Sequence, residues 1–153
     1  MILPRYRIAP STIPGAGKGL FLDEPLAHGR IAVAPDKIEE TWSFADIIGN
    51  PERAAQMYAS VRWFEDRYTL SPDWPDECFI NHSFEPTGLW VLGFTFAARD
   101  LPAGTELTVD YRHLLAPGQE EEFRDAQTGN AIVGYAWKDS LRQGLDALRA
   151  LLD

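Results

Sequence analysis

The sequence contains one cysteine, Cys78, in 153 residues. A single thiol can form neither an intrachain disulfide nor a four-cysteine zinc site, so both kinds of crosslink are excluded. No apolar run approaches the roughly 20 residues that a membrane-spanning helix requires, and the segment from Met1 to Arg5 lacks the apolar stretch of a signal peptide. We therefore expect a cytoplasmic protein that does not associate with a membrane.

Basic residues are also scarce. The chain has 14 Lys and Arg against 23 Asp and Glu, which gives a formal net charge of −9 at pH 7. A nucleic-acid surface needs clustered basic side chains to meet the phosphates, and the sequence contains no such cluster, so we expect no direct nucleic-acid binding. The negative charge suits a basic partner such as a lysine-rich peptide. It also favours solubility on its own, and composition does not separate these two explanations.

Apolar residues are plentiful enough for one packed core, since the hydrophobic share is 45% and the aromatic share is 12%. At this length we expect a single domain. Short strand-like segments separated by Gly and Pro predict a mainly β protein before the C-terminal region. The predicted strands are Ile31 to Ala34, Arg67 to Leu70, Leu89 to Ala98 and Glu106 to Tyr111. In the third of them, period-two alternation predicts one shared face for Trp90, Leu92, Phe94 and Phe96.

Two segments have helical signals. Asn50 is a favourable N-cap residue and Pro51 suits the first helical position, which predicts a helix from about Pro51 to Ala59. Near the C-terminal end, leucines recur at helical spacing after Asp139-Ser140, which predicts an amphipathic helix capped by that pair. These leucines are Leu141, Leu145, Leu148 and Leu152. The stripe either covers the β core or pairs with a second copy, so a monomer and a homodimer both remain open.

Three short segments contain the residues best suited to chemistry. They are the glycine segment, Gly15 to Phe21 (GAGKGLF), the Asn-His segment, Phe79 to Pro86 (FINHSFEP), and the tyrosine segment, Ala103 to Tyr111 (AGTELTVDY). A glycine-rich turn lets main-chain N–H groups approach a ligand closely. No strand-turn-helix unit follows it, so a dinucleotide-binding site is not expected. In this order and spacing the three segments resemble the SET domain family, whose members transfer a methyl group from S-adenosylmethionine to a protein lysine.

The resemblance runs from about Arg7 to Tyr111 and implies both a fold and an activity. The implied fold is α+β, mainly β with short helices, in the SET-type β-clip arrangement of several small sheets, followed here by a C-terminal amphipathic helix. Residues 1–118 would form the catalytic domain, and residues 119–153 would form a C-terminal helical extension that packs on it. The implied activity is that of an S-adenosylmethionine-dependent protein-lysine N-methyltransferase acting on a basic, lysine-containing protein or peptide.

The resemblance also assigns the cofactor contacts residue by residue. The turn at Ala16, Gly17 and Lys18 would hold the carboxylate of S-adenosyl-L-methionine. Asn81 would offer its carbonyl oxygen to the ammonium group of the cofactor, and His82 would contact the adenine edge through its backbone. His82 receives no proton-transfer role, and no metal ion is implied.

Tyr111 is the implied catalytic residue and a further cofactor contact, because it matches the family's terminal tyrosine, whose hydroxyl lies where the methyl group meets the substrate nitrogen. Family members line the lysine channel with aromatic side chains, and we nominate Tyr68 and Trp63 for this role. They close the cofactor site with a C-terminal segment, whose aromatics here are Phe123, Tyr135 and Trp137, and we expect Trp137 to stack on the adenine. The lysine must lose a proton before it attacks. A dry channel beside a sulfonium lowers its pKa, so that the proton can leave to water.

Other classes of function remain open. A SET-fold module that has lost catalysis would still bind a peptide or partner, although the retained Tyr111 and the Asn81-His82 pair favour turnover. A metal-dependent enzyme would require the convergence of His28, His82, His113 and Cys78. A paired-carboxylate hydrolase is disfavoured, because the predicted strand directs Glu106 and Asp110 away from Tyr111, and we expect both carboxylates to make structural hydrogen bonds.

Overall fold

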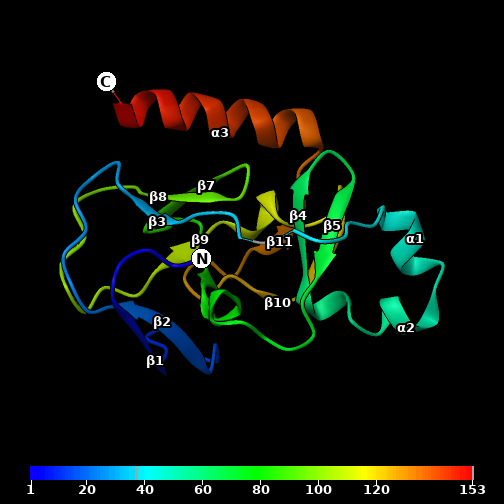
Figure 1. The fold of residues 1–153 in the computed structure, drawn as a ribbon, viewed down its shortest axis with the longest axis horizontal. Coiled ribbons are helices and arrows are strands. Elements are labelled where there is room, and N and C mark those ends of the chain that lie inside the picture. Colours follow the sequence, from blue (N-terminus) through cyan, green and yellow to red (C-terminus); the bar gives the residue numbers. More distant parts are fainter. Residues whose placement is uncertain (37, 153) are drawn as a thin grey trace.

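The computed structural model describes residues 1–36 and 38–152 of the chain. Figure 1 shows small sheets joined by short helices, with one long helix near the C-terminal end. The described part of the protein is therefore α+β and mainly β, as the sequence predicts.

Most of the strands pair in short antiparallel sheets. The two-stranded antiparallel sheets are β1 (Tyr6–Pro10) with β2 (Lys18–Leu22), β4 (Ser60–Phe64) with β5 (Arg67–Leu70), and β10 (Glu120–Arg124) with β11 (Ala131–Val133). The three-stranded sheet has the order β3 (Ile31–Val33), β8 (Phe94–Ala97) and β7 (Gly88–Val91). A parallel pair joins β6 (Asn81–His82) to β9 (Thr108–Val109).

Helices connect and cover these sheets. Asn50 caps α2 (Pro51–Ala54), because its side-chain oxygen accepts hydrogen bonds from the N–H groups of Glu52 and Arg53. The remaining helices are α1 (Phe44–Ile48), the 3-10 helices η1 (Met57–Ala59), η2 (Asp76–Phe79) and η3 (Tyr111–His113), and the long α3 (Trp137–Leu152).

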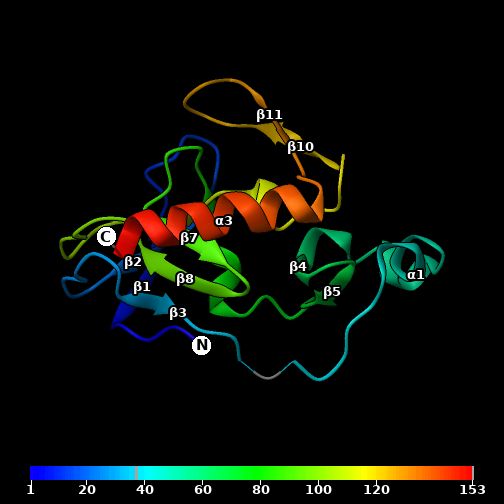
Figure 2. The ribbon, with the colours of Figure 1, turned by 90° about the horizontal axis from the view of Figure 1, so that it is seen from above.

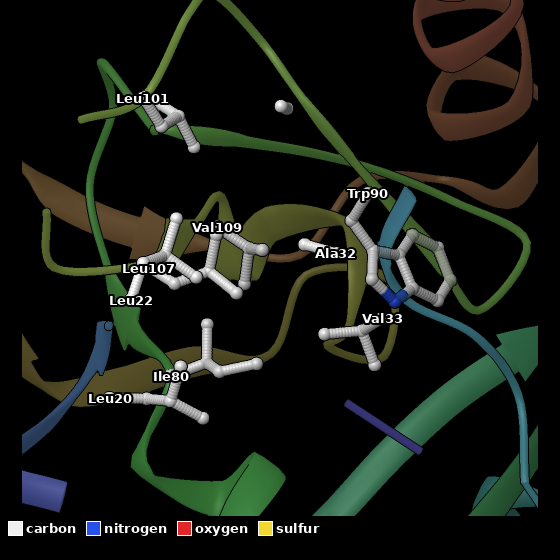
Figure 3. Close-up of a cluster of buried hydrophobic side chains, with 10 residues drawn as sticks. Leu20, Leu22, Ala32, Val33, Ile80, Trp90, Leu101, Leu107 and Val109 are labelled. Carbon is white, nitrogen blue, oxygen red and sulfur yellow. The ribbon is translucent and has the colours of Figure 1, made fainter. Parts of the chain in front are cut away.

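The main hydrophobic core lies among β2, the three-stranded sheet and β9 (Figure 3). Leu20 and Leu22 of β2 are fully buried, as is Leu107, which precedes β9. The other members of the cluster are Ala32, Val33, Ile80, Trp90, Ala97, Leu101 and Val109. Burial of apolar surface stabilises by about 25 cal/mol per Å², so this cluster anchors the strands on which the three motif segments lie.

β2 joins the glycine segment directly to this core. One edge of β2 pairs with β1. Along its other edge, the Leu22 N–H donates to the Thr105 carbonyl (2.9 Å) and the Leu107 N–H donates to the Leu20 carbonyl (2.8 Å). β2 therefore lies between two neighbours, and the glycine segment and the tyrosine segment are adjacent in space.

The predicted single strand from Leu89 to Ala98 is wrong. This segment forms the hairpin of β7 and β8, which turns at Leu92 and Gly93 with φ of +51° and +84°. A two-residue turn with both φ values positive matches the twist of an antiparallel pair. The turn also removes the predicted common face, because Trp90 is buried whereas Leu92 and Phe94 are exposed.

The predicted helix from Pro51 to Ala59 is shorter than expected. Asn50 caps it as predicted, but α2 ends at Ala54 and the chain continues into η1. No residue of α2 is buried, so tertiary packing does not support a longer helix at this position.

α3 confirms the predicted C-terminal helix, and it packs on β7 of the same chain. Figures 1 and 2 show α3 lying across the three-stranded sheet. Its buried face differs from the predicted leucine stripe, because Ser140 and Gly144 are buried while Leu145 is exposed. Small residues allow close approach here, since a Cβ atom added at Gly144 would meet Val91 of β7 at 3.4 Å.

The segment that follows residue 118 is less helical than expected. It begins with the β10–β11 hairpin, which Figure 2 shows projecting from the rest of the chain. α3 then starts at Trp137, so the predicted cap Asp139-Ser140 lies within the helix. The Ser140 hydroxyl is instead within hydrogen-bonding distance of His113 Nδ1 (2.9 Å), and this contact ties α3 to η3.

Candidate functional site

The carboxylate of Glu106 joins the tyrosine segment to the Asn-His segment and to Ser11 and Thr12, which lie just before the glycine segment. Its Oε1 accepts hydrogen bonds from Ser11 Oγ (2.6 Å) and Asn81 Nδ2 (3.0 Å). Its Oε2 accepts from the Thr12 N–H (2.8 Å) and from Thr12 Oγ1 (2.5 Å). Burial opposes the charge of this carboxylate, but the hydrogen bonds outweigh burial and hold the pKa of Glu106 below its ordinary value. We name this arrangement the Glu106 junction.

Gly19 explains how the carboxylate reaches this position. A Cβ atom at Gly19 would lie 2.2 Å from Glu106 Oε1, so only glycine leaves room for the junction. The prediction that Glu106 makes structural hydrogen bonds is confirmed. Sequence reasoning missed Ser11 and Thr12, although two adjacent hydroxyl residues shortly before a glycine turn are a signal that could have been noticed.

Asp110 likewise makes the structural hydrogen bonds that the sequence predicts. Its Oδ1 accepts from the Arg112 N–H (3.0 Å), and both of its oxygens accept from the Arg112 guanidinium. The guanidinium in turn lies over the rings of Phe84 (4.3 Å) and Tyr135 (4.8 Å). Asp110 therefore holds η3 in place, next to the position of Tyr111.

Asn81 is oriented by the groups around its amide. Its Nδ2 donates to the Lys18 carbonyl (2.9 Å) and to Glu106 Oε1 (3.0 Å). Both partners are acceptors only, so the amide nitrogen must face them, and this fixes the opposite orientation for Oδ1. The parallel pairing of Asn81 with Thr108 holds the backbone of Asn81 in place. The side chain therefore keeps one carbonyl oxygen as an acceptor for a ligand.

His82 is buried and makes a backbone contact with the tyrosine segment. Its Nδ1 accepts from the Tyr111 N–H (3.1 Å), which leaves Nε2 as the protonated nitrogen of the neutral ring. Nε2 lies 3.7 Å from Asp125 Oδ1, beyond hydrogen-bonding distance. Burial lowers the pKa of His82, so the ring is neutral near pH 7. This state agrees with a positioning role rather than proton transfer.

Tyr111 lies at the start of η3, not at the end of a strand. Its hydroxyl donates to the Ile80 carbonyl (2.7 Å), and its ring packs 5.4 Å from His82 and 6.4 Å from Phe123. Burial raises the pKa of Tyr111, and the neighbouring charge of Glu121 raises it further. The phenol is therefore protonated at neutral pH and offers oxygen lone pairs rather than a negative charge.

A cleft of about 1290 Å³ opens beside the junction. Of the predicted site residues, those that line it are Ala16, Lys18, Asn81, His82, Tyr111 and Trp63. Gly17 lies in the chain between two of these lining residues. The structure thus brings most of the predicted residues to one cavity, although they come from β2, β4, β6, η3 and the turn before β2.

Two predicted site residues lie elsewhere. Tyr68 is buried in a second hydrophobic cluster with Ile47 and Ala116, and it is not among the described residues that line the cleft. Trp137 starts α3 and lies near the Arg62 guanidinium, 5.8 Å from the ring, again outside the cleft lining of the described chain. Both positions correct the expectation, because each aromatic ring is used to pack one element on another.

The sequence reasoning missed Glu121 and Trp74 as lining residues, whereas it had already named Phe123 among the aromatics of the C-terminal segment. The edge of the cleft formed by β10 includes Glu121 and Phe123. On another side Tyr58 and Trp74 are exposed, and their rings stack at 6.3 Å.

Basic and acidic residues are unequally distributed around the cleft. The acidic residues that line it are Asp36, Glu39, Glu40, Glu77, Glu121 and Asp125, whereas its lysine and arginine side chains, among the described residues, are Lys18 and Arg124. The lining is therefore predominantly acidic, which favours a positively charged ligand.

The proposed metal ligands do not converge in the described part of the chain. Within residues 1–36 and 38–152, no group of three or more His, Cys, Asp and Glu side chains is arranged to hold a metal ion. His113 instead contacts Ser140, and His82 contacts the Tyr111 backbone.

No family model matches the chain, and no curated protein matches it. Among the described residues, no helix has both the length and the apolar character needed to cross a bilayer.

Proposed function

We propose that this chain is a SET-type protein-lysine N-methyltransferase that uses S-adenosylmethionine. The observation that carries the proposal is the Glu106 junction, which joins the tyrosine segment to the Asn-His segment beside one cleft. From the same junction, Asn81 also donates to the Lys18 carbonyl of the glycine segment. The parallel pairing of β6 with β9 adds a second link between the Asn-His and tyrosine segments. On this proposal the small sheets form the β-clip arrangement of the family.

The residues around the cleft fit the proposed cofactor. Gly15 and Gly17 adopt positive φ values of 81° and 74°, and a Cβ atom at either would meet no other atom within 4 Å, so the turn is open to a ligand. Asn81 Oδ1 is the acceptor suited to an ammonium group, and Lys18 lines the cleft with a charge suited to a carboxylate. S-adenosylmethionine, when bound, supplies a methyl group activated by a sulfonium.

Tyr111 is the proposed catalytic residue. Because its hydroxyl proton is donated to the Ile80 carbonyl, the phenol oxygen presents lone pairs to weak C–H···O and N–H contacts. Such contacts would hold the amine and the methyl group on one line, and positioning of this kind removes several kcal/mol of barrier. His82 supports this geometry by accepting a hydrogen bond from the Tyr111 backbone.

The proposed substrate is a lysine-containing basic protein or peptide. The predominantly acidic lining of the cleft would attract such a substrate, and the net charge of −9 would disfavour nucleic acid. The single cysteine agrees with action in the reducing cytoplasm.

The test is transfer of radiolabelled methyl from S-adenosylmethionine to a panel of lysine-rich peptides, with cofactor binding measured separately by calorimetry. We expect transfer by the wild type and unchanged cofactor binding in the presence of a chelator. Tyr111→Phe should slow single-turnover transfer by about 10- to 100-fold, equivalent to about 1.4–2.7 kcal/mol of transition-state stabilisation, with cofactor affinity preserved.

Tyr135→Phe is the matched control, because it also removes one phenol hydroxyl but lies outside the described cleft lining. Its transfer rate should equal that of the wild type. Binding of cofactor and peptide without transfer would instead support a non-catalytic binding module, and absence of cofactor binding would contradict the proposal altogether.

A further inference from the structure

Glu121 occupies a position in the cleft that none of the three motif segments explains. It lies on β10 and is half-buried, and it lines the same cleft as Tyr111. Phe123 of the same strand also lines the cleft, and its ring is 6.4 Å from the Tyr111 ring. The neighbouring Glu122 is exposed and is not among the described residues that line the cleft.

The Glu121 carboxylate has no protein partner within the part of the chain that the structure describes. No hydrogen bond or ion pair joins it to another described residue, whereas Glu120 lies 3.9 Å from Arg124, and Asp125 accepts two hydrogen bonds from Thr128. A partly buried carboxylate without a partner is costly, so its retention beside a cavity points to a cation that arrives with a ligand.

The electrostatic surroundings of Glu121 favour proton uptake. Burial raises its pKa, and the charge of Glu122 on the same strand raises it further. The titratable groups around it also include Tyr111 of η3, whose pKa is raised by burial and further by the charge of Glu121.

Two cationic side chains of the described residues lie along the same cleft, but both are committed elsewhere, and the Met1 N-terminal ammonium that also lines it pairs with Glu77 at 2.8 Å. Arg124 pairs with Glu120, and Lys18 Nζ lies over the Phe79 ring at 6.0 Å. Neither is bonded to the Glu121 carboxylate, so this side chain is left to receive a cation from outside the protein.

We infer that Glu121 receives the ammonium group of the substrate lysine and acts as the base that removes its proton before methyl transfer. The inference rests on the proposed function. In the first step an N–H bond of the ammonium breaks and an O–H bond forms on the Glu121 carboxylate, which yields a neutral amine and a neutral carboxylic acid. The neutral amine would then be the nucleophile toward the methyl group that bound S-adenosylmethionine would supply, with the thioether of the demethylated cofactor as the leaving group. The proton on Glu121 then passes to water.

This assignment replaces the expectation that the proton leaves directly to water. A lysine with an ordinary pKa of about 10.4 is almost fully protonated at pH 7, so a positioned acceptor increases the reactive fraction. General bases of this kind contribute about 10²- to 10⁴-fold, most when their pKa is near the working pH.

The experiment compares Glu121→Gln with Glu122→Gln, which makes the same change of charge at the next residue of β10, outside the described lining of the cleft. Single-turnover methyl transfer to a lysine-rich peptide is measured from pH 6 to pH 10 at saturating cofactor, with calorimetry for cofactor affinity and a thermal melt for folding. We expect Glu121→Gln to slow transfer by about 100-fold at pH 7, with cofactor affinity unchanged. The defect should shrink as the pH rises, because more of the lysine is already neutral in solution. Glu122→Gln keeps the Glu121 carboxylate and removes only a neighbouring charge that raises its pKa, so its transfer should stay within a few-fold of the wild type.

A second variant removes the Glu121 carboxylate without introducing the amide group of glutamine. Glu121→Ala should lose transfer to a similar extent, and added formate should restore part of it, which a purely structural role would not allow. A folded Glu121→Gln protein that transfers methyl at the wild-type rate across the pH range would overturn the inference while leaving the proposed function intact. A wild type that binds no cofactor and transfers no methyl would overturn both.

Discussion

Replacing Glu106 by glutamine tests whether the Glu106 junction holds the tyrosine segment against the Asn-His segment and against Ser11 and Thr12. The change preserves the shape of the side chain but converts one carboxylate oxygen into an NH₂ group. If that group faces Thr12, the Thr12 N–H loses its acceptor at 2.8 Å. If the NH₂ group instead takes the position of Oε1, the Asn81 amide loses its acceptor at 3.0 Å. In either orientation an N–H donor of the protein meets another donor, and rotation of hydroxyl groups cannot repair this contact.

The expected loss follows from the hydrogen bonds. A hydrogen bond to a charged group contributes about 1.5–3 kcal/mol, and a donor left without an acceptor adds its own desolvation penalty. We therefore expect Glu106→Gln to lower the free energy of unfolding by about 3 kcal/mol. For a domain of this size that corresponds to a decrease in Tm of about 6–12 °C.

The loss of unfolding free energy in Glu106→Gln should also depend on pH. The folded-state pKa of Glu106 lies below its ordinary value, since the hydrogen bonds outweigh burial. Its ionisation therefore stabilises the fold above the ordinary glutamate pKa of about 4.3, and this contribution is lost as the pH falls through the lower, folded-state pKa. The difference in stability between the wild type and Glu106→Gln should be full at pH 7 and should narrow below about pH 4.

Urea unfolding at a series of pH values measures this difference, with the m-value as a check that the transition itself is unchanged. Glu122→Gln is the control, because Glu122 is exposed and makes no contact with the junction. A Glu106→Gln protein as stable as the wild type at pH 7, or one whose deficit is the same at pH 3 and pH 7, would refute the role assigned to the junction.

Two further predictions concern the cofactor contact and the C-terminal helix. Asn81→Ala removes the proposed acceptor for an ammonium group, a loss of about 1.5–3 kcal/mol. Calorimetry should therefore show S-adenosylmethionine binding weakened by about 10- to 100-fold. Equal affinity of the two proteins would show that Asn81 does not contact the cofactor. Gly144→Ala should stabilise the protein by about 0.5–1 kcal/mol in urea unfolding, because alanine favours a helix and its Cβ would meet Val91 at an ordinary contact distance of 3.4 Å. Gly144→Leu should destabilise it by separating α3 from β7, and a neutral effect of leucine would show that this face of α3 is not tightly packed.

Local patterns in the sequence predicted several elements correctly. Where such a pattern gave a wrong prediction, the cause is also local. The Arg67 to Leu70 strand, the Asn50 cap and the C-terminal helix depend on residues close in sequence, and the structure confirms them. Alternation from Leu89 to Ala98 was misleading, because Leu92 takes a positive φ that non-glycine residues seldom adopt, and periodicity alone does not reveal the turn.

Packing partners decided which residues of an element are buried. The leucine spacing in α3 predicted a helix but not its buried face, since close approach to β7 favours Ser140 and Gly144 over Leu145. Among the aromatic residues, Tyr68 was nominated for its strand before the Asn-His segment and Trp137 for its place in the C-terminal segment. Their rings instead fill space between elements, and the identity of a side chain does not specify which neighbour it packs against.

The sequence by itself determined the α+β class, the acidic character and the order of the three motif segments. Only the tertiary structure decided that these segments meet, because Glu106 and Thr12 are 94 residues apart in the chain and their hydrogen bond depends on the packing of β2 and β9. It also decided that β10 brings Glu121 to the same cleft, where an acidic side chain outside every motif lies beside Tyr111. Contacts between residues so distant in sequence arise from the folded core, so no local pattern contains them.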